Sequence, residues 1–71
     1  MNRTPVRSSH LKSVGYDSTA QTLEVEFSDG DIYHYYNVPT HIHAGLMSAF
    51  SKGTFLNQRI KEAGYRYKKI R

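Results

Sequence analysis

Strict alternation of apolar and polar residues near the middle of the chain constrains the fold more than any other feature. Every second residue is apolar in the segment 22–27, Thr-Leu-Glu-Val-Glu-Phe. A period of two is typical of a β-strand with one buried and one solvated face. The segment 14–16 has the same spacing, and the segment 32–36 is rich in aromatic and β-branched residues, which strands favour. We therefore expect a three-stranded antiparallel β-meander.

The loop between the second and third predicted strands determines which side chains face the core. If Asp29-Gly30 is a two-residue loop, Val25 pairs with His34, and His34 faces the core. If Ser28-Asp29-Gly30 is a three-residue loop with Gly30 in the left-handed conformation, Val25 pairs with Tyr33 and Leu23 with Tyr35. We favour the second register, which places Tyr33 and Tyr35 on the apolar face and His34 on the opposite face.

Two short helices are predicted after the strands. Pro39 suits a first helical turn, and Ile42, Leu46 and Phe50 recur at four-residue steps, which predicts a helix over 39–50 with these side chains on its buried face. Ser51 is a predicted N-cap for a second helix. The buried positions of that helix are expected to be Leu56, Ile60 and Ala63, and Gly64 is its expected end.

The two ends of the chain show little helical pattern. Residues 1–9 are polar and contain Pro5, so we expect a flexible or extended arm, followed by a single domain over 10–71. The segment 65–70 alternates again, which predicts either a short extended segment or a fourth, edge strand. The predicted fold is thus α+β, a β-meander followed by two short helices and this C-terminal segment.

Size and composition disfavour catalysis. A chain of 71 residues has room for one small core and no large cleft, and it has no cysteine to act as a nucleophile or a zinc ligand. His41 and His43 are two apart, which puts them on different faces of a helix, so we expect no metal site and no cofactor. The lack of cysteine and of a long apolar run is typical of a cytoplasmic protein without membrane contact.

Charge is distributed unevenly along the chain. The net charge is +4, yet the segment 17–31 contains five acidic residues and no basic one. The last thirteen positions contain six basic residues and one acidic residue. A basic segment with interleaved aromatic residues is suited to a polyanion such as RNA. The candidate nucleic-acid-binding residues are Lys52, Arg59, Lys61, Tyr65, Arg66, Tyr67, Lys68, Lys69 and Arg71.

The tripeptide Ser51-Lys52-Gly53 at a predicted helix start is a candidate anion-binding site. Free backbone N–H groups and the helix dipole favour an anion there, and Lys52 would add a positive charge. The structural alternative is an ordinary N-cap in which Gly53 permits a tight turn between two helices.

Tyr33 and Tyr35 can also be interpreted in two ways, either as core residues or as exposed rings that stack on bases.

The order of short motifs along the chain resembles the KTSC domain family. The resemblance covers roughly residues 7–70 and rests on Val14-Gly15-Tyr16-Asp17, Leu23-x-Val25-x-Phe27, Gly30, Tyr33-x-Tyr35, Val38-Pro39, Ser51-Lys52-Gly53 and Phe55-x-Asn57-x-x-Ile60. Phe50 departs from the pattern, because a smaller residue is expected before Ser51. The family is named for its occurrence at the C-terminus of some bacterial lysyl-tRNA synthetases. The resemblance suggests RNA binding from that context, implies a central motif at Tyr33 and Tyr35, and gives no basis for assigning catalysis.

Two functional hypotheses follow from the sequence. The first is a small non-enzymatic module that binds structured RNA, such as tRNA, through the basic C-terminal segment. The second is a protein-interaction module or a small inhibitor of the kind carried by phages and mobile elements. It would pair an edge strand with a protein partner or a second copy, aided by the unequal charge distribution.

Overall fold

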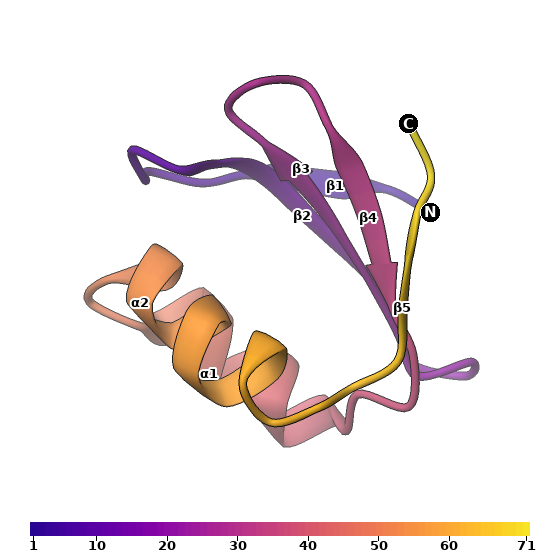
Figure 1. The fold of residues 1–71 in the computed structure, drawn as a ribbon. Coiled ribbons are helices and arrows are strands. Elements are labelled where there is room, and N and C mark those ends of the chain that lie inside the picture. The colour runs from indigo at the N-terminus through magenta and orange to yellow at the C-terminus, as the bar shows by residue number, and fades with distance from the viewer.

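Five antiparallel strands form one sheet, and the helices cover one of its faces (Figure 1). The computed structural model describes residues 1–71. Strand order follows chain order, through β1 (Arg3–Pro5), β2 (Leu11–Asp17), β3 (Thr22–Phe27), β4 (Ile32–Tyr35) and β5 (Tyr67–Lys69). Between β4 and β5 the chain forms α1 (Thr40–Ser48), α2 (Lys52–Leu56) and a π-helical turn, η1 (Asn57–Lys61). The predicted α+β class with two helices is confirmed, whereas the predicted number of strands is wrong.

The additional strands lie at the two edges of the sheet. β1 forms within the segment expected to be an arm and pairs with β2, with Arg3 opposite Gly15. A Cβ atom at Gly15 would lie 2.8 Å from the carbonyl oxygen of Asn2, so only glycine permits this close approach. β5 pairs with β4, with Tyr67 opposite Tyr35. The C-terminal segment is therefore an edge strand, which was one of the two alternatives expected from the sequence. It is the fifth strand of the sheet and not the fourth.

The predicted three-residue loop between β3 and β4 is confirmed. Gly30 has a φ angle of +96°, and the N–H of Phe27 donates to the carbonyl of Asp31 at 2.8 Å. Leu23 is paired with Tyr35 and Val25 with Tyr33. Tyr33 and Tyr35 therefore lie on the face that packs against the helices.

The first helix is shorter than predicted, because α1 ends at Ser48 and not at Phe50. Ala49 has an extended conformation (φ −66°, ψ 141°), because the chain reverses direction between the two helices. This takes Phe50 out of the helical phase, and the side chain is fully exposed instead of buried. Phe55 packs against α1 in its place, with its ring against Gly45.

The second helix begins as predicted but has a shorter buried face. The hydroxyl of Ser51 accepts a hydrogen bond from the N–H of Thr54 at 3.3 Å, which confirms the N-cap. Leu56 and Ile60 are buried, whereas Ala63 is exposed because the helical structure ends at Lys61.

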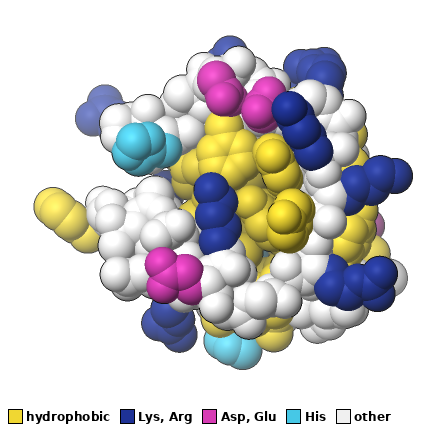
Figure 2. All heavy atoms as spheres, viewed as in Figure 1, with side chains coloured by type: hydrophobic (Ala, Val, Ile, Leu, Met, Phe, Trp, Pro, Cys, Tyr) yellow, Lys and Arg dark blue, Asp and Glu magenta, His cyan; other side chains and the backbone are white.

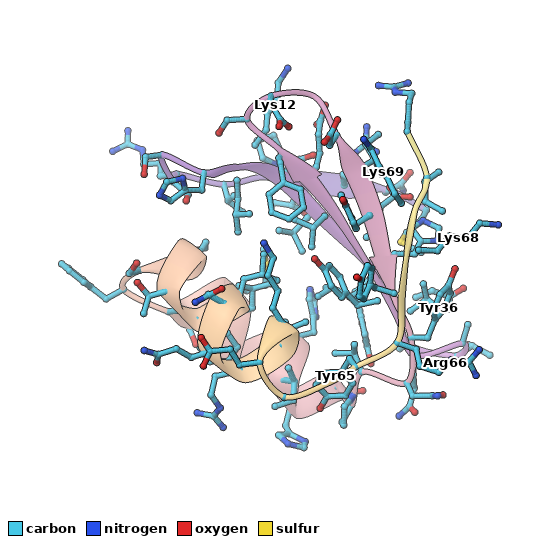
Figure 3. The ribbon with its side chains drawn as sticks, viewed as in Figure 1. Lys12, Tyr36, Tyr65, Arg66, Lys68 and Lys69 are labelled. Carbon is cyan, nitrogen blue, oxygen red and sulfur yellow. The ribbon has the colours of Figure 1, made fainter.

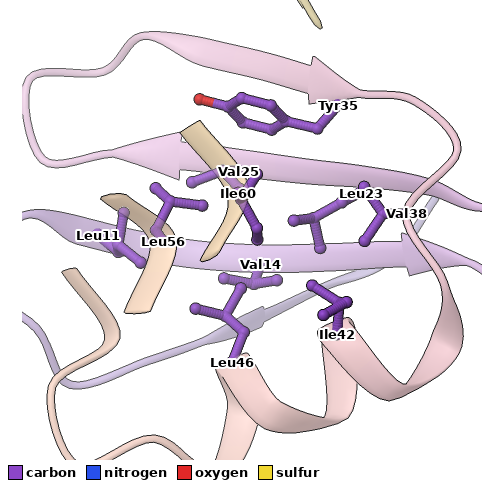
Figure 4. Packing of buried hydrophobic residues seen from close by; sticks show 10 residues of the cluster. All are labelled: Leu11, Val14, Leu23, Val25, Tyr35, Val38, Ile42, Leu46, Leu56 and Ile60. Carbon is purple, nitrogen blue, oxygen red and sulfur yellow. The ribbon is translucent and has the colours of Figure 1, made fainter. Parts of the chain in front are cut away.

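A single core joins the sheet to the helices (Figure 4). It consists of Leu11, Val14, Leu23, Val25, Tyr35, Val38, Ile42, Leu46, Leu56 and Ile60. Both the alternating residues of the strands and the four-residue steps of the helices contribute to it, as the sequence patterns predict. None of the helices has the length and hydropathy needed to cross a membrane.

Candidate nucleic-acid interface

Three tyrosine rings from two neighbouring strands form a cluster on the helix-facing side of the sheet. The ring centroids of Tyr33 and Tyr35 are 6.2 Å apart. Tyr67 of β5 lies 6.0 Å from Tyr33 and 6.1 Å from Tyr35, measured between ring centroids. Phe27 extends the cluster with an edge-to-face contact to Tyr33 at 5.6 Å. Exposure rises steeply across the cluster, from 3% for Tyr35 to 65% for Tyr67.

The tyrosine cluster forms one wall of a surface groove between the sheet and the helices. The groove has a volume of about 950 Å³. Leu56, Asn57 and Lys61 line the helical side, and His10 lies at one end. Figure 2 shows apolar side chains gathered in a hollow of this face, with basic and acidic side chains around it. The groove is thus the place where the aromatic surface is open to solvent.

Burial changes the acidity of the central tyrosine. Desolvation, together with the neighbouring Tyr33 and Tyr67, raises the pKa of Tyr35 to about 12. The folded protein therefore keeps this phenol neutral to a higher pH than an exposed tyrosine.

Two lysines from different elements lie beside the groove. The ammonium of Lys61 lies 5.0 Å from the centroid of the Phe27 ring, within range of a cation–π interaction. Lys69 lies opposite Tyr33 in the sheet, and its Nζ is 3.5 Å from Oδ2 of Asp31. Lys61 is the last residue of η1, a π-helical turn, which is a rare element in proteins.

The other basic residues of β5 and its approach lie on the opposite face of the sheet. Side chains alternate along a strand, so Arg66 and Lys68 point away from the groove, whereas Tyr67 and Lys69 point toward it. Neither Arg66 nor Lys68 forms an ion pair. Figure 3 shows Lys69, Lys68 and Arg66 in succession along this edge, with Tyr36 beside Arg66. The basic C-terminal segment thus presents cations on both faces of one edge.

The remaining candidate residues lie elsewhere. The guanidinium carbon of Arg59 lies 5.5 Å from the centroid of the Phe55 ring, on the helical side. Tyr65 packs against the core at the base of β5, and Arg71 follows that strand at the chain end. The structure therefore divides the nine candidate residues among the groove, the opposite face of β5 and the helices.

The Ser51-Lys52-Gly53 segment forms a local cap. Besides accepting from the Thr54 N–H, the Ser51 hydroxyl donates to Oγ1 of Thr54 at 2.9 Å. The ammonium of Lys52 donates to the carbonyl of Ala49 at 3.3 Å. The hydroxyl and the ammonium both have protein partners, and α2 has only five residues. This geometry is that of an ordinary N-cap, with the Ser51 hydroxyl and the Lys52 ammonium engaged within the chain.

A network of charged residues occupies the face of the sheet that the helices leave open. Oε1 of Glu24 lies 2.7 Å from Nε2 of His34, and Oε2 of Glu24 accepts a hydrogen bond from Arg3 at 3.0 Å. Burial raises the pKa of Glu24, but the bonds from His34 and Arg3 outweigh it and leave the pKa below its usual value. The hydrogen bond from Ser13 likewise lowers the pKa of Glu26. Part of the acidic segment is therefore neutralised within the molecule.

Sequence reasoning missed both the groove and the charge network. Each depends on an edge strand that the sequence patterns did not establish: β5 brings Tyr67 to Tyr33, and β1 brings Arg3 to Glu24. The available signal for the groove was the Tyr-x-Tyr spacing shared by 33–35 and 65–67, since pairing of the two segments places Tyr67 opposite Tyr35. The four histidines do not gather, since no three histidine or acidic side chains come close enough together to hold a metal ion.

Comparison with known proteins shows that the fold occurs in a protein of known structure. A KTSC domain protein from Yersinia pestis has a crystal structure that matches with a TM-score of 0.90 and 41% sequence identity, covering 99% of this chain and 97% of that one. An uncharacterized protein from Stutzerimonas stutzeri is 46% identical over 70 residues, which is 99% of each chain.

Similarity also extends to part of a much larger protein. A lysine–tRNA ligase from Trichormus variabilis is 42% identical over 53 residues, which cover 75% of this chain and 9% of the ligase. The model of the KTSC domain matches residues 7–68. With a family match over most of its length and a close structural relative of nearly equal extent, this chain belongs to the KTSC domain family.

Proposed function

We propose that this protein is a small RNA-binding module that holds the phosphates of an RNA strand along β5. The observation that carries the proposal is the arrangement of charge on that strand. Arg66 and Lys68 point to one face without acidic partners, while Lys69 and nearby Lys61 lie by the tyrosine groove on the other. Unpaired cations on an edge, next to exposed aromatic surface, are typical of proteins that bind single strands or unpaired segments.

The relatives support RNA as the polyanion. A lysine–tRNA ligase handles tRNA by its name, and 9% of one such enzyme is similar to this chain. A binding module is the kind of part that adds RNA affinity to a catalytic protein without taking part in the reaction. We therefore assign the module a binding role and no catalytic step.

The proposal is tested by binding total tRNA at several salt concentrations. If the basic groups neutralise about five phosphates, log affinity should fall with log salt at a slope of roughly −3.5 to −4.5. Affinity should then drop by a factor of roughly 100 to 500 between 50 and 200 mM salt. Absence of binding at 50 mM salt would overturn the proposal.

A pair of variants locates the binding surface. The double variant Arg66→Gln, Lys68→Gln should weaken tRNA binding and make the salt slope shallower by about 1.5. Arg59→Gln is the matched control, because Arg59 lies on the helical side against Phe55. Because the control removes one charge and the double variant removes two, a control that loses half as much log affinity as the double variant would show that the cations act only through net charge.

The geometry favours RNA binding over strand pairing with a protein. Both edge strands, β1 and β5, have only three residues. β1 contains Pro5, which has no N–H to donate, and β5 contains Lys68 and Lys69. Short edges with proline or lysine are features that prevent strand addition.

A further inference from the structure

We propose that the groove formed by Phe27, Tyr33, Tyr35 and Tyr67 holds one unpaired nucleobase of the bound RNA. This inference rests on the proposed function and specifies its ligand: the module prefers RNA with unpaired bases over a continuous duplex. Tyr67 is 65% exposed, although the centroid of its ring lies 6.0 Å from that of Tyr33 and 6.1 Å from that of Tyr35. A large aromatic ring left open beside two others offers a flat surface on which a base can stack.

The exposed rings are supported from behind. Tyr35 is only 3% exposed and belongs to the core cluster, which fixes the position of the wall that Tyr33 and Tyr67 extend into solvent. A rigid aromatic wall suits base stacking, because little freedom is lost when the base binds.

Charge around the groove fits a base whose phosphates lie along β5. The ammonium of Lys61 lies over the Phe27 ring, 5.0 Å from its centroid, and Lys69 extends from β5 toward the same groove. On β5, Tyr67 lies between Arg66 and Lys68, which point to the other face. A strand that follows this edge therefore meets cations on both sides of the position where a base can turn inward.

The acidic residues of the β3–β4 loop restrict the path of the RNA. The carboxylate of Asp29 accepts a hydrogen bond from the N–H of Asp31 at 3.0 Å, and Asp31 pairs with Lys69 at 3.5 Å. Both carboxylates line the loop end of the groove and repel phosphates there. The phosphates are thus directed to the side of Lys61 and β5, while the base faces the aromatic wall.

The geometry of duplex RNA explains the expected preference. Paired bases are stacked inside the helix, and their faces are not available to a protein side chain, whereas unpaired bases can be splayed out and stacked on aromatic rings. The groove volume of about 950 Å³ is ample for a nucleotide. Loops and single-stranded ends should therefore bind more tightly than an uninterrupted duplex.

The experiment uses a short single-stranded RNA with one 2-aminopurine, and the same RNA annealed to its complement. The chain has six tyrosines and no tryptophan, so 2-aminopurine can be excited above the absorption of the protein. On titration, the wild-type protein should change the emission of the single strand saturably, and it should bind the duplex more weakly.

Two tyrosine variants separate the groove from the opposite face. Tyr67→Ala removes an exposed ring of the groove and should weaken single-strand binding about tenfold or more, abolish the emission change and leave the salt slope unaltered. Tyr36→Ala is the matched control, because Tyr36 lies beside Arg66 on the other side of the sheet. Lys61→Gln provides a second test, since it should weaken binding and make the salt slope shallower.

The outcomes separate this inference from the function on which it rests. If RNA binds but single strand and duplex bind equally, or Tyr67→Ala behaves as Tyr36→Ala does, the groove inference is wrong and RNA binding stands. If no RNA binds at 50 mM salt, both are wrong. If Tyr67→Ala loses the preference for single-stranded RNA and Tyr36→Ala keeps it, the groove inference and RNA binding are both supported.

Discussion

Tyr35 is both a core residue and part of the groove wall. Its pairing with Leu23 places the ring against the helices, and the ring centroid lies 6.2 Å from that of Tyr33 and 6.1 Å from that of Tyr67. The position of this ring could be predicted from the sequence, because strand alternation and the Ser28-Asp29-Gly30 loop together determine the register. The contact of Tyr35 with Tyr67 could not be predicted from the sequence, since it depends on pairing between segments more than thirty residues apart.

The raised pKa of Tyr35 predicts a late step in the alkaline titration of the protein. The folded state favours the neutral phenol, so its contribution to stability is complete below pH 10 and is lost as the pH rises through about 12. Absorbance at about 295 nm should show one tyrosine ionising after the others. Tyr35→Phe should remove this late step, and Tyr36→Phe should not. A wild-type titration with no late step would contradict the prediction.

The lowered pKa of Glu24 predicts acid sensitivity of the fold. Burial acts to raise this pKa, but the bonds from His34 and Arg3 prevail, so the folded state favours the carboxylate. Its contribution to stability is therefore present above the pKa of the unfolded chain and is lost as the pH falls through the lower folded value. Glu24→Gln should destabilise the protein at pH 7, with a difference from wild type that shrinks toward pH 3.

Denaturant unfolding at several pH values measures this effect. The control is Glu62→Gln, since Glu62 lies in an exposed position after η1. A constant difference between Glu24→Gln and wild type across the pH range would show that the carboxylate charge does not stabilise the fold.

At the scale of elements, the two edge strands show where sequence patterns fail. β1 has three exposed residues and no apolar alternation, so nothing within it indicates a strand. It forms because β2 offers Gly15, over which the N-terminal segment can pass. The last predicted turn of the first helix does not form, because the chain reverses direction at Ala49. The ring of Phe55 packs against α1 where Phe50 was expected.

Gly15→Ala should therefore loosen β1 and lower stability by about 1–2 kcal/mol, because the new methyl group would collide with the carbonyl of Asn2. Hydrogen exchange should become faster for the amides of β1 than for those of β3. Gly30→Asn is a comparison variant: no atom lies within 4 Å of a Cβ there, but the φ angle of +96° strains any side chain, so stability should fall without faster exchange in β1. Unchanged stability in Gly15→Ala would mean that the backbone shifts without cost.

At the scale of the whole molecule, folding reorganises the charge distribution of the sequence. The acidic segment 17–31 and the basic C-terminal segment suggest two oppositely charged parts that could attract a second copy. In the structure, Arg3 neutralises Glu24, and Lys69 pairs with Asp31. The acids are thus partly compensated within one chain, whereas Arg66 and Lys68 keep their charge unpaired.

We therefore expect the protein to be monomeric at every salt concentration in the absence of RNA. Its edge strands are three residues long and carry proline or lysine, and the acidic surface that a second copy would need is partly occupied by Arg3 and Lys69. Light scattering at 20 and 500 mM salt should give the mass of one chain, 8.2 kDa, in both conditions. A dimer at 20 mM that dissociates at 500 mM would instead support charge-driven pairing of two copies.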